Sequence, residues 1–188
     1  WAVDTAANFT NLGGMSANGT DFMSPNGAFH GDYLNAASSA TGIVAARQTG
    51  LTFTNGTTYT VSVWARKSVG YDYLEISNLD ASGTGMTFAK SFNLSTGAVG
   101  TASGGTVDAS GMDEYSGGWY RCSVTFQADA SSNGSVYYKA RNDNAVSTTF
   151  SATNGQSLFI WGAQVEAKKY ATSYIPTTTV AVTRAADV

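Results

Sequence analysis

From Leu158 the chain reads Leu-Phe-Ile-Trp-Gly-Ala-Gln-Val-Glu, and it continues with Thr-Ser-Tyr-Ile-Pro-Thr from Thr172 and Thr-Arg-Ala-Ala-Asp over 183–187. The first nine residues are rich in β-branched and aromatic side chains, so they predict a strand. Gly162 interrupts this strand, and a glycine at such a place marks a bulge or a close approach of a neighbouring group. Pro176 has no N–H to donate to a sheet, so it favours an edge or a turn.

Turn signals and alternating runs predict further short strands in the rest of the chain. Asn-Gly pairs recur and favour the positive-φ turns that close hairpins. Between them apolar and polar residues alternate with a period of two, which is typical of half-buried strands. The strands that we expect are 28–35, 42–49, 57–67, 73–78, 86–93, 119–126, 134–142, 158–166 and 180–184.

Helices are not indicated anywhere, even in the Ala-rich segment 36–46. Residues 94–97 are expected to form a hairpin loop, and 101–111, rich in Gly, Ser and Ala, a surface loop. Many short strands with little or no helix predict an all-β sandwich or barrel. The length of 188 residues favours a single domain, 1–188, large enough to bury a core without cross-links.

The composition excludes several classes of function. Charged residues make up 12% of the chain, about half the usual share. The net charge of −3 and the absence of a basic stripe argue against nucleic-acid binding. No run of eighteen apolar residues exists, so we expect no membrane insertion. The chain opens at Trp1 without a signal peptide, which suggests an excised domain or a mature fragment.

The polar faces of the predicted strands combine aromatic and cationic side chains. Aromatic rings stack on the C–H faces of sugars, while guanidinium and amide groups hydrogen-bond their hydroxyls or a uronic carboxylate. If Trp161 faces the core, Gln164 on the same strand points to the polar side. A Trp on a polar face can also be covered by a loop or a terminal strand, and its role is then structural. The candidate ligand-binding residues are Trp64, Arg66, Tyr73, Trp119, Arg121, Tyr137 and Gln164.

Catalytic and metal-binding patterns are poor in this sequence. His30 is the single histidine, which leaves no imidazole set for a triad or a zinc site. Cys122 falls on the apolar side of its strand, so a buried, inert thiol is expected. Asp113 and Glu114 are adjacent on a strand and point to opposite faces, so they do not form a glycosidase pair. We therefore predict a protein that is not an enzyme.

Three segments carry a resemblance to a known family. Thr-Tyr-Thr-Val-Ser-Val-Trp-Ala-Arg-Lys (58–67), Gly-Trp-Tyr-Arg-Cys-Ser-Val-Thr-Phe (118–126) and the segment from Leu158 are similar to signatures of jelly-roll carbohydrate-binding modules. Such lectin-like modules, concanavalin A-like or galactose-binding-like, occur in phage structural proteins and in polysaccharide-active enzymes of marine bacteria. The resemblance implies a jelly-roll β-sandwich of two antiparallel sheets. The N-terminal fifty residues match these modules poorly.

The resemblance implies binding of a polysaccharide or cell-surface glycan, within a parent enzyme or a virion protein. It places the protein outside the cell or on a virion surface. No cofactor is required, although such modules often hold a structural calcium ion, for which Asp4 and Asp187 would be arbitrary choices of ligand. Two alternatives stay open. One is an assembly module of a phage tail or capsid, and the other is a glycan hydrolase or lyase on the same fold.

Overall fold

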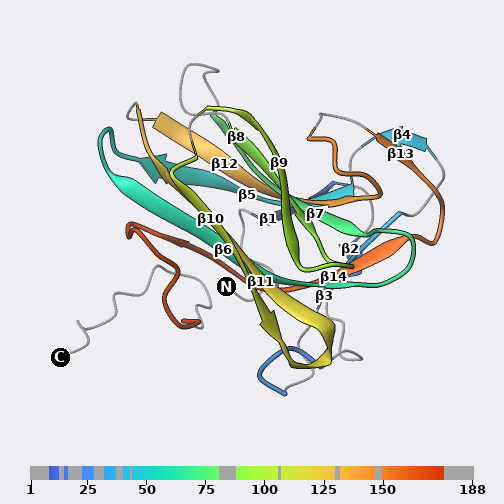
Figure 1. Cartoon of the computed structure of the whole chain (residues 1–188). Coiled ribbons are helices and arrows are strands. Elements are labelled where there is room, and N and C mark those ends of the chain that lie inside the picture. Colours follow the sequence, from blue (N-terminus) through green and yellow to red (C-terminus); the bar gives the residue numbers. More distant parts are fainter. Residues whose placement is uncertain are drawn as a thin grey trace.

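A computed structural model describes residues 9–12, 15–16, 23–27, 32–36, 40–42, 44–80, 88–105, 107–129, 132–146 and 150–175. Two six-stranded antiparallel sheets lie one over the other (Figure 1). Sheet I has the order β1-β5-β12-β7-β8-β9, and sheet II has the order β10-β11-β6-β14-β3-β2. A small separate pair joins β13 to β4. The chain therefore folds as an all-β, jelly-roll sandwich, as predicted.

The strand bounds follow the predicted runs closely. Sheet I contains β1 (Phe9–Leu12), β5 (Val44–Phe53), β12 (Ser132–Arg141), β7 (Tyr73–Asp80), β8 (Phe88–Asn93) and β9 (Ala98–Gly104). Sheet II contains β10 (Ala109–Tyr115), β11 (Trp119–Gln127), β6 (Thr58–Lys67), β14 (Ser157–Glu166), β3 (Asp32–Asn35) and β2 (Met15–Ser16). The small pair is β4 (Ala40–Gly42) with β13 (Phe150–Ala152). The predicted strand 180–184 lies outside the described residues.

The core fills the space between the two sheets. Alternation in β6 turns Val61 and Val63 inward, and both are fully buried. Rings from the two sheets meet there: Phe88 of sheet I lies 4.8 Å from Phe126 of sheet II, centroid to centroid. Cys122 is buried in the same cluster, as predicted. The inward faces of the sheets are thus used for packing, and their outer faces remain for other roles.

The segment 101–111 differs from the prediction. It contains the end of β9 and the start of β10 instead of one long surface loop. Backbone pairing explains the difference, because Ser103 pairs with Ala89 and Ser110 pairs with Val124 at the two sheet edges. Small, polar residues can complete such edge strands without contributing to the core. The predicted hairpin loop at 94–97 is confirmed.

Helical structure in the described part of the chain is confined to the short 3₁₀ turn Ser116–Gly118 between β10 and β11. Gly117 and Gly118 both have positive φ there, 73° and 76°. No described helix has the length and apolar character needed to span a membrane.

Gly162 forms the bulge that its place in β14 predicted. The pairing of β14 with β6 shifts register between Trp161 and Gln164, and Gly162 has φ +64°. A Cβ there would lie 2.9 Å from the Trp64 ring, so only glycine lets the two strands approach this closely. Because of this extra residue, the alternation of inward and outward side chains is reversed after Gly162. Ala163 faces the core, whereas Trp161 lies on the outer side, which corrects the core position considered for it from the sequence.

Candidate functional site

The predicted ligand-binding residues do not share one surface. Trp64, Arg66, Trp119, Arg121 and Gln164 belong to the outer face of sheet II. Tyr73 and Tyr137 belong to the outer face of sheet I. The two groups lie on opposite sides of the sandwich, so a single groove built from all seven is wrong. Alternation was predicted correctly along β6 and β11, but the assignment of strands to sheets was not visible in the sequence.

An aromatic row crosses the outer face of sheet II at one end. We use this name for Tyr115 of β10, Trp119 of β11, Arg66 of β6 and Phe159 of β14, which are direct cross-strand neighbours in that order. The Arg66 guanidinium carbon lies 5.2 Å from the Trp119 ring centroid and 4.5 Å from that of Phe159. The guanidinium is thus held between two aromatic side chains, a cation–π arrangement on each side.

The accessibility of the aromatic row varies along its length. Tyr115 is 40% exposed, and Arg66 and Phe159 are half-buried. Trp119 is buried, because Met23 lies beside it and accepts a hydrogen bond from its indole Nε1 at 3.2 Å. Figure 1 shows this described piece, 23–27, next to the turn between β10 and β11. The aromatic row therefore offers Tyr115, Arg66 and Phe159 to solvent.

Arg66 has unusual electrostatic surroundings. Its Nε is buried without a hydrogen-bond partner, and burial lowers the pKa of the guanidinium. Among the described residues, it is the one buried or half-buried cation whose side chain makes no hydrogen bond or ion pair. Its stem packs on the turn, since a Cβ at Gly118 would lie 3.9 Å from the Arg66 Cγ and Cδ. The side chain is therefore positioned while its donors remain unused.

The next row of sheet II is covered by the chain itself. Trp64 and Trp161 lie 5.1 Å apart, and the Arg121 guanidinium lies 4.3 Å from the Trp64 ring. Tyr174 packs on both tryptophans, at 6.0 Å from Trp64 and 4.4 Å from Trp161. Trp64 is only 4% exposed as a result. The expectation of an exposed Trp64 was wrong, and the alternative of a Trp covered by a terminal segment is correct.

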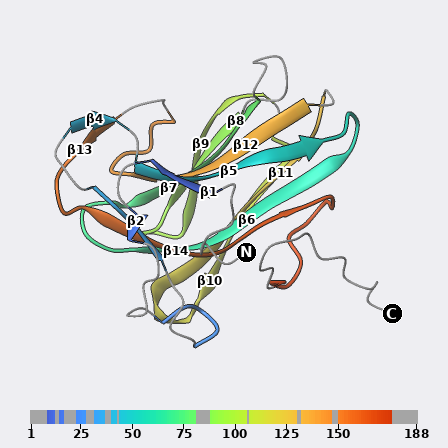
Figure 2. The same cartoon turned by 180° about the vertical axis from the view of Figure 1, so that it is seen from behind.

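We call residues 168–175 the covering segment. It follows β14 and turns back over sheet II (Figure 2). The sheet holds its backbone through side chains: the Thr60 hydroxyl donates to the carbonyl of Lys168 at 2.9 Å, and Arg121 Nη2 donates to the carbonyl of Thr172. Arg121 also donates to the Ser62 hydroxyl at 3.2 Å. Arg121 is therefore a structural residue in this arrangement.

Gln164 and Glu166 anchor the same segment. The backbone N–H of Ile175 donates to Gln164 Oε1 at 3.1 Å, and that of Thr172 donates to Glu166 Oε2 at 3.0 Å. Gln164 is 3% exposed and lies on the outer side, as predicted. Its side chain is used to hold the covering segment, so a ligand would reach it only if that segment moved away.

The outer face of sheet I carries a buried charge network. Lys139 Nζ lies 2.5 Å from Glu75 Oε1, and Arg141 Nη1 lies 3.8 Å from Glu75 Oε2. Arg141 Nη2 also contacts Asp143 Oδ1 at 2.9 Å. Glu75, Lys139 and Arg141 are buried although they point away from the core. Each cation in this network faces a carboxylate.

Tyr73 and Tyr137 flank this network and are half-buried. The Tyr73 hydroxyl accepts a hydrogen bond from Asn93 at 3.1 Å. The Tyr137 hydroxyl accepts one from Arg47 Nη1 at 3.2 Å. Both hydroxyls are thus already bonded within the sheet. Arg47 is a cation of this face that the sequence did not single out.

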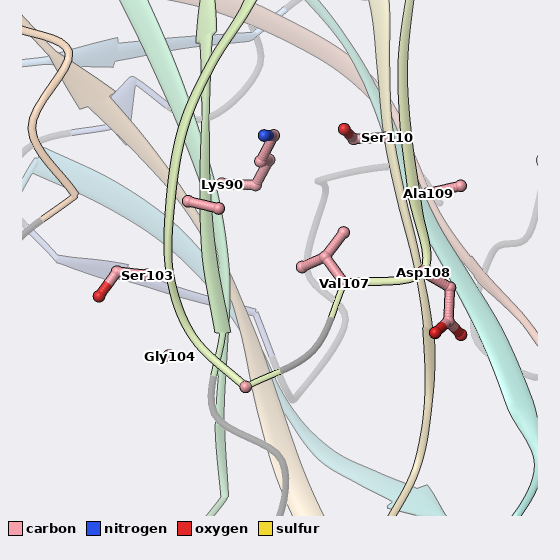
Figure 3. Close-up of a pocket in the computed structure, with 9 residues that line it drawn as sticks. Lys90, Ser103, Gly104, Val107, Asp108, Ala109 and Ser110 are labelled. Carbon is pink, nitrogen blue, oxygen red and sulfur yellow. The ribbon is translucent and has the colours of Figure 1, made fainter.

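A pocket of about 420 Å³ opens between the edges of the two sheets. Figure 3 shows the Lys90 ammonium of β8 and the Ser110 hydroxyl of β10 at one end, with the Asp108 carboxylate pointing away. Lys90 Nζ donates to the carbonyl of Gly100 at 2.9 Å. The volume suits a small ligand, but the lining has no aromatic platform. Sequence reasoning missed this pocket because its walls come from the segment taken for a loop.

The described residues do not provide three His, Cys, Asp or Glu side chains placed to hold a metal ion. Asp4, Asp187 and His30 lie outside the described residues. Burial raises the pKa of the Cys122 thiol, which keeps it protonated and a poor nucleophile at neutral pH.

Comparisons with known proteins leave the family open. No family model matches the chain, and no curated protein does. A solved structure of the N-terminal CBM22-1–GH10 modules of Clostridium thermocellum endo-1,4-β-D-xylanase 10B, complexed with xylohexaose, matches with 17% identity and a TM-score of 0.47. The match covers 92% of this chain and 28% of that chain. A likeness this distant carries no argument about function.

Proposed function

We propose that this chain is a non-catalytic glycan-binding module whose contact surface is the aromatic row of sheet II. The observation behind the proposal is the unpartnered Arg66 guanidinium, held between Trp119 and Phe159 beside the exposed Tyr115. Its three solvent-accessible side chains are the Tyr115 ring, the Arg66 guanidinium and the Phe159 ring, in that order across the sheet. This matches a sugar chain, which has apolar C–H faces and a rim of hydroxyl groups.

The dimensions of the row suit an extended ligand. Tyr115 and Phe159 are separated by three inter-strand spacings, which is about 14 Å. An oligosaccharide could lie across the strands with rings on Tyr115 and Phe159 and hydroxyls on Arg66. None of these side chains is a carboxylate or an imidazole, the groups that most often act as general acid or base. Such a module would meet polysaccharides outside the cell or on a virion surface.

Affinity is expected to be modest. Sugar hydroxyls exchange hydrogen bonds with water for hydrogen bonds with protein, and each exchange contributes little. The stacking contacts therefore carry much of the binding. Trp119 is 2% exposed, so it contributes mainly by packing against Arg66. This assigns Arg66 a contact role and Trp119 a positioning role.

Affinity gel electrophoresis against a panel of neutral and acidic polysaccharides tests the proposal. Tyr115→Ala should weaken retardation by roughly two- to tenfold, which corresponds to the loss of one stacking contact. Tyr170→Ala is the matched control, because Tyr170 is 65% exposed on the covering segment, outside the row. If polysaccharides retard both variants and the parent chain equally, the aromatic row is not the binding surface.

The assembly alternative predicts another result. If the row is buried against a second copy, light scattering will show a stable oligomer that Tyr115→Ala dissociates. Binding of a polysaccharide by a monomer, with loss of binding in Tyr115→Ala, excludes that reading of the row.

A further inference from the structure

We infer that the glycan is acidic and that one of its carboxylates binds to Arg66. This inference rests on the proposed function and adds the chemical class of the ligand. It is drawn from the Arg66 side chain, which makes neither a hydrogen bond nor an ion pair, unlike the other buried or half-buried cations in the described part of the chain.

The next residue in β6 provides the first contrast. Lys67 Nζ lies 2.6 Å from Asp72 Oδ1 and also donates to the Ser95 hydroxyl. Lys139 and Arg141 share Glu75. These three cations have carboxylate partners, whereas Arg66 has none among the residues that the structure describes.

Arg121 provides the second contrast, because it lies on the same face one row away. Burial lowers the pKa of Arg121, and Tyr115 and the carboxylates of Glu166 and Asp113 partly offset that shift. For Arg66, burial is the single influence that shifts the pKa. Within the described ranges, this face thus has carboxylates near Arg121 and none that shifts the pKa of Arg66.

A half-buried guanidinium without a partner is costly in the free protein. Burial removes water from the cation, and contact with two aromatic rings returns only part of that loss. An oxyanion of the ligand would supply the missing acceptor. A carboxylate suits this role, because the guanidinium edge offers parallel donors that match its two oxygens.

Positioning by the neighbouring residues strengthens the argument. The rings of Trp119 and Phe159 and the turn at Gly118 restrict the Arg66 side chain before any ligand arrives. Less conformational entropy is then lost on binding. The net charge of −3 works against an acidic ligand at long range, but at about 0.1 M salt such effects are screened beyond about 10 Å.

The experiment compares acidic polysaccharides with neutral derivatives of the same backbone. Three pairs are used: polygalacturonate with its methyl ester, alginate with its propylene glycol ester, and carboxymethylcellulose with hydroxyethylcellulose. At least one acid should bind about tenfold or more tightly than its neutral partner, which is the effect of one charge-assisted hydrogen-bonded contact. Dextran sulfate with dextran forms a separate arm, which identifies binding to sulfate.

Two variants connect the preference to Arg66. Arg66→Gln should bring the acid down to the affinity of its neutral partner, and Arg66→Lys should restore only part of the preference because it lacks the planar fork. Arg47→Gln is the control on the opposite face. Circular dichroism and unfolding midpoints verify that each variant is folded. The comparison of each acid with its neutral derivative uses the parent chain and needs no variant.

Each outcome has a distinct meaning. A preference for the acid that Arg66→Gln abolishes supports the inference. Equal binding of acid and ester, still dependent on Tyr115, overturns the inference while the proposed glycan binding stands. If dextran sulfate is the single acidic polymer that is preferred over its neutral partner, the inference of a carboxylate ligand is wrong. An absence of binding to every polysaccharide overturns both the inference and the proposed function.

Discussion

The outer faces of the two sheets contain similar side chains in different electrostatic settings. On sheet I the buried cations Lys139 and Arg141 face the carboxylate of Glu75. On sheet II the cations Arg66 and Arg121 lie against tryptophan rings. Both faces thus combine aromatic residues with cations, and the sequence pattern of their strands is nearly the same.

The difference shows how to separate structural cations from candidate contact residues. A buried cation with an internal carboxylate has its charge compensated in the free protein, so no ligand is needed to explain it. Arg121 has hydrogen bonds to Ser62 and the covering segment, which also explain it. Arg66 has neither kind of partner in the described part of the chain, so the comparison distinguishes it from the other arginines.

Glu75→Gln should have the largest effect. It leaves the buried Lys139 and Arg141 without the shared carboxylate, so stability should fall by about 3–5 kcal/mol. The melting temperature should fall by roughly 6–12 °C or more. Thermal and urea unfolding measure both. A loss of less than about 1 kcal/mol would show that sheet I does not depend on its charge network. The proposed difference between the two outer faces would then be wrong.

Arg121→Met should have an intermediate effect. It removes the donor that holds Ser62 and the carbonyl of Thr172, at a cost of about 1–3 kcal/mol. The covering segment should loosen, so trypsin should cleave faster after Lys168 and Lys169. Cleavage at the parent rate would mean that the segment is held mainly by Tyr174. Arg47→Met on sheet I serves as the control, since it contacts no part of the segment.

Arg66→Met should change stability little. No hydrogen bond or ion pair is lost, and the methionine can fill the space between Trp119 and Phe159, so the change should stay below about 1 kcal/mol. Urea unfolding measures it beside Glu75→Gln. A loss comparable to that of Glu75→Gln would mean that Arg66 is structural, which would remove the distinction between the faces.

Removing the exposed pair Lys67–Asp72 should have the smallest effect on stability. A hydrogen bond from Lys67 is the main cause that lowers the pKa of Asp72. The folded state therefore binds this proton less tightly than the unfolded chain. The stabilisation is present above the unfolded pKa of about 4 and is lost as pH falls through the lower folded value. Both side chains are nearly half exposed, so Asp72→Asn should cost less than about 1 kcal/mol at neutral pH.

Unfolding of the parent chain and Asp72→Asn, followed from pH 7 to pH 2.5, measures this effect. The two curves should converge in the acid range. A difference that persists or grows there would assign the effect of the substitution to something other than the charge pair.

Local pattern predicted most of the strands. The alternation in 119–126 placed Cys122 in the core, and the structure confirms it; the alternating run 57–67 buries Val61 and Val63 in the same way. The glycine within the predicted strand 158–166 indicated a bulge, and the structure has one at Gly162. The consequence of the bulge was missed, because one extra residue inverts which side chains face inward, and Trp161 moved to the outer side.

The site was predicted only in part. Trp64, Arg66, Trp119 and Arg121 do lie together, since cross-strand neighbours follow from β6 beside β11. The separation of Tyr73 and Tyr137 onto the other sheet depends on strand order, which arises from long-range packing. Tyr115 was missed, although the turn at 116–118 would have placed it opposite Trp119.

The covering segment has a practical consequence for where this folding unit can be cut. A gene fragment that stops at Glu166 would retain every residue of β14, yet Trp64 and Trp161 would lose Tyr174 and lie bare on the surface. Contiguous exposed aromatic surface promotes self-association. Such a shortened product should therefore aggregate more readily than the full chain.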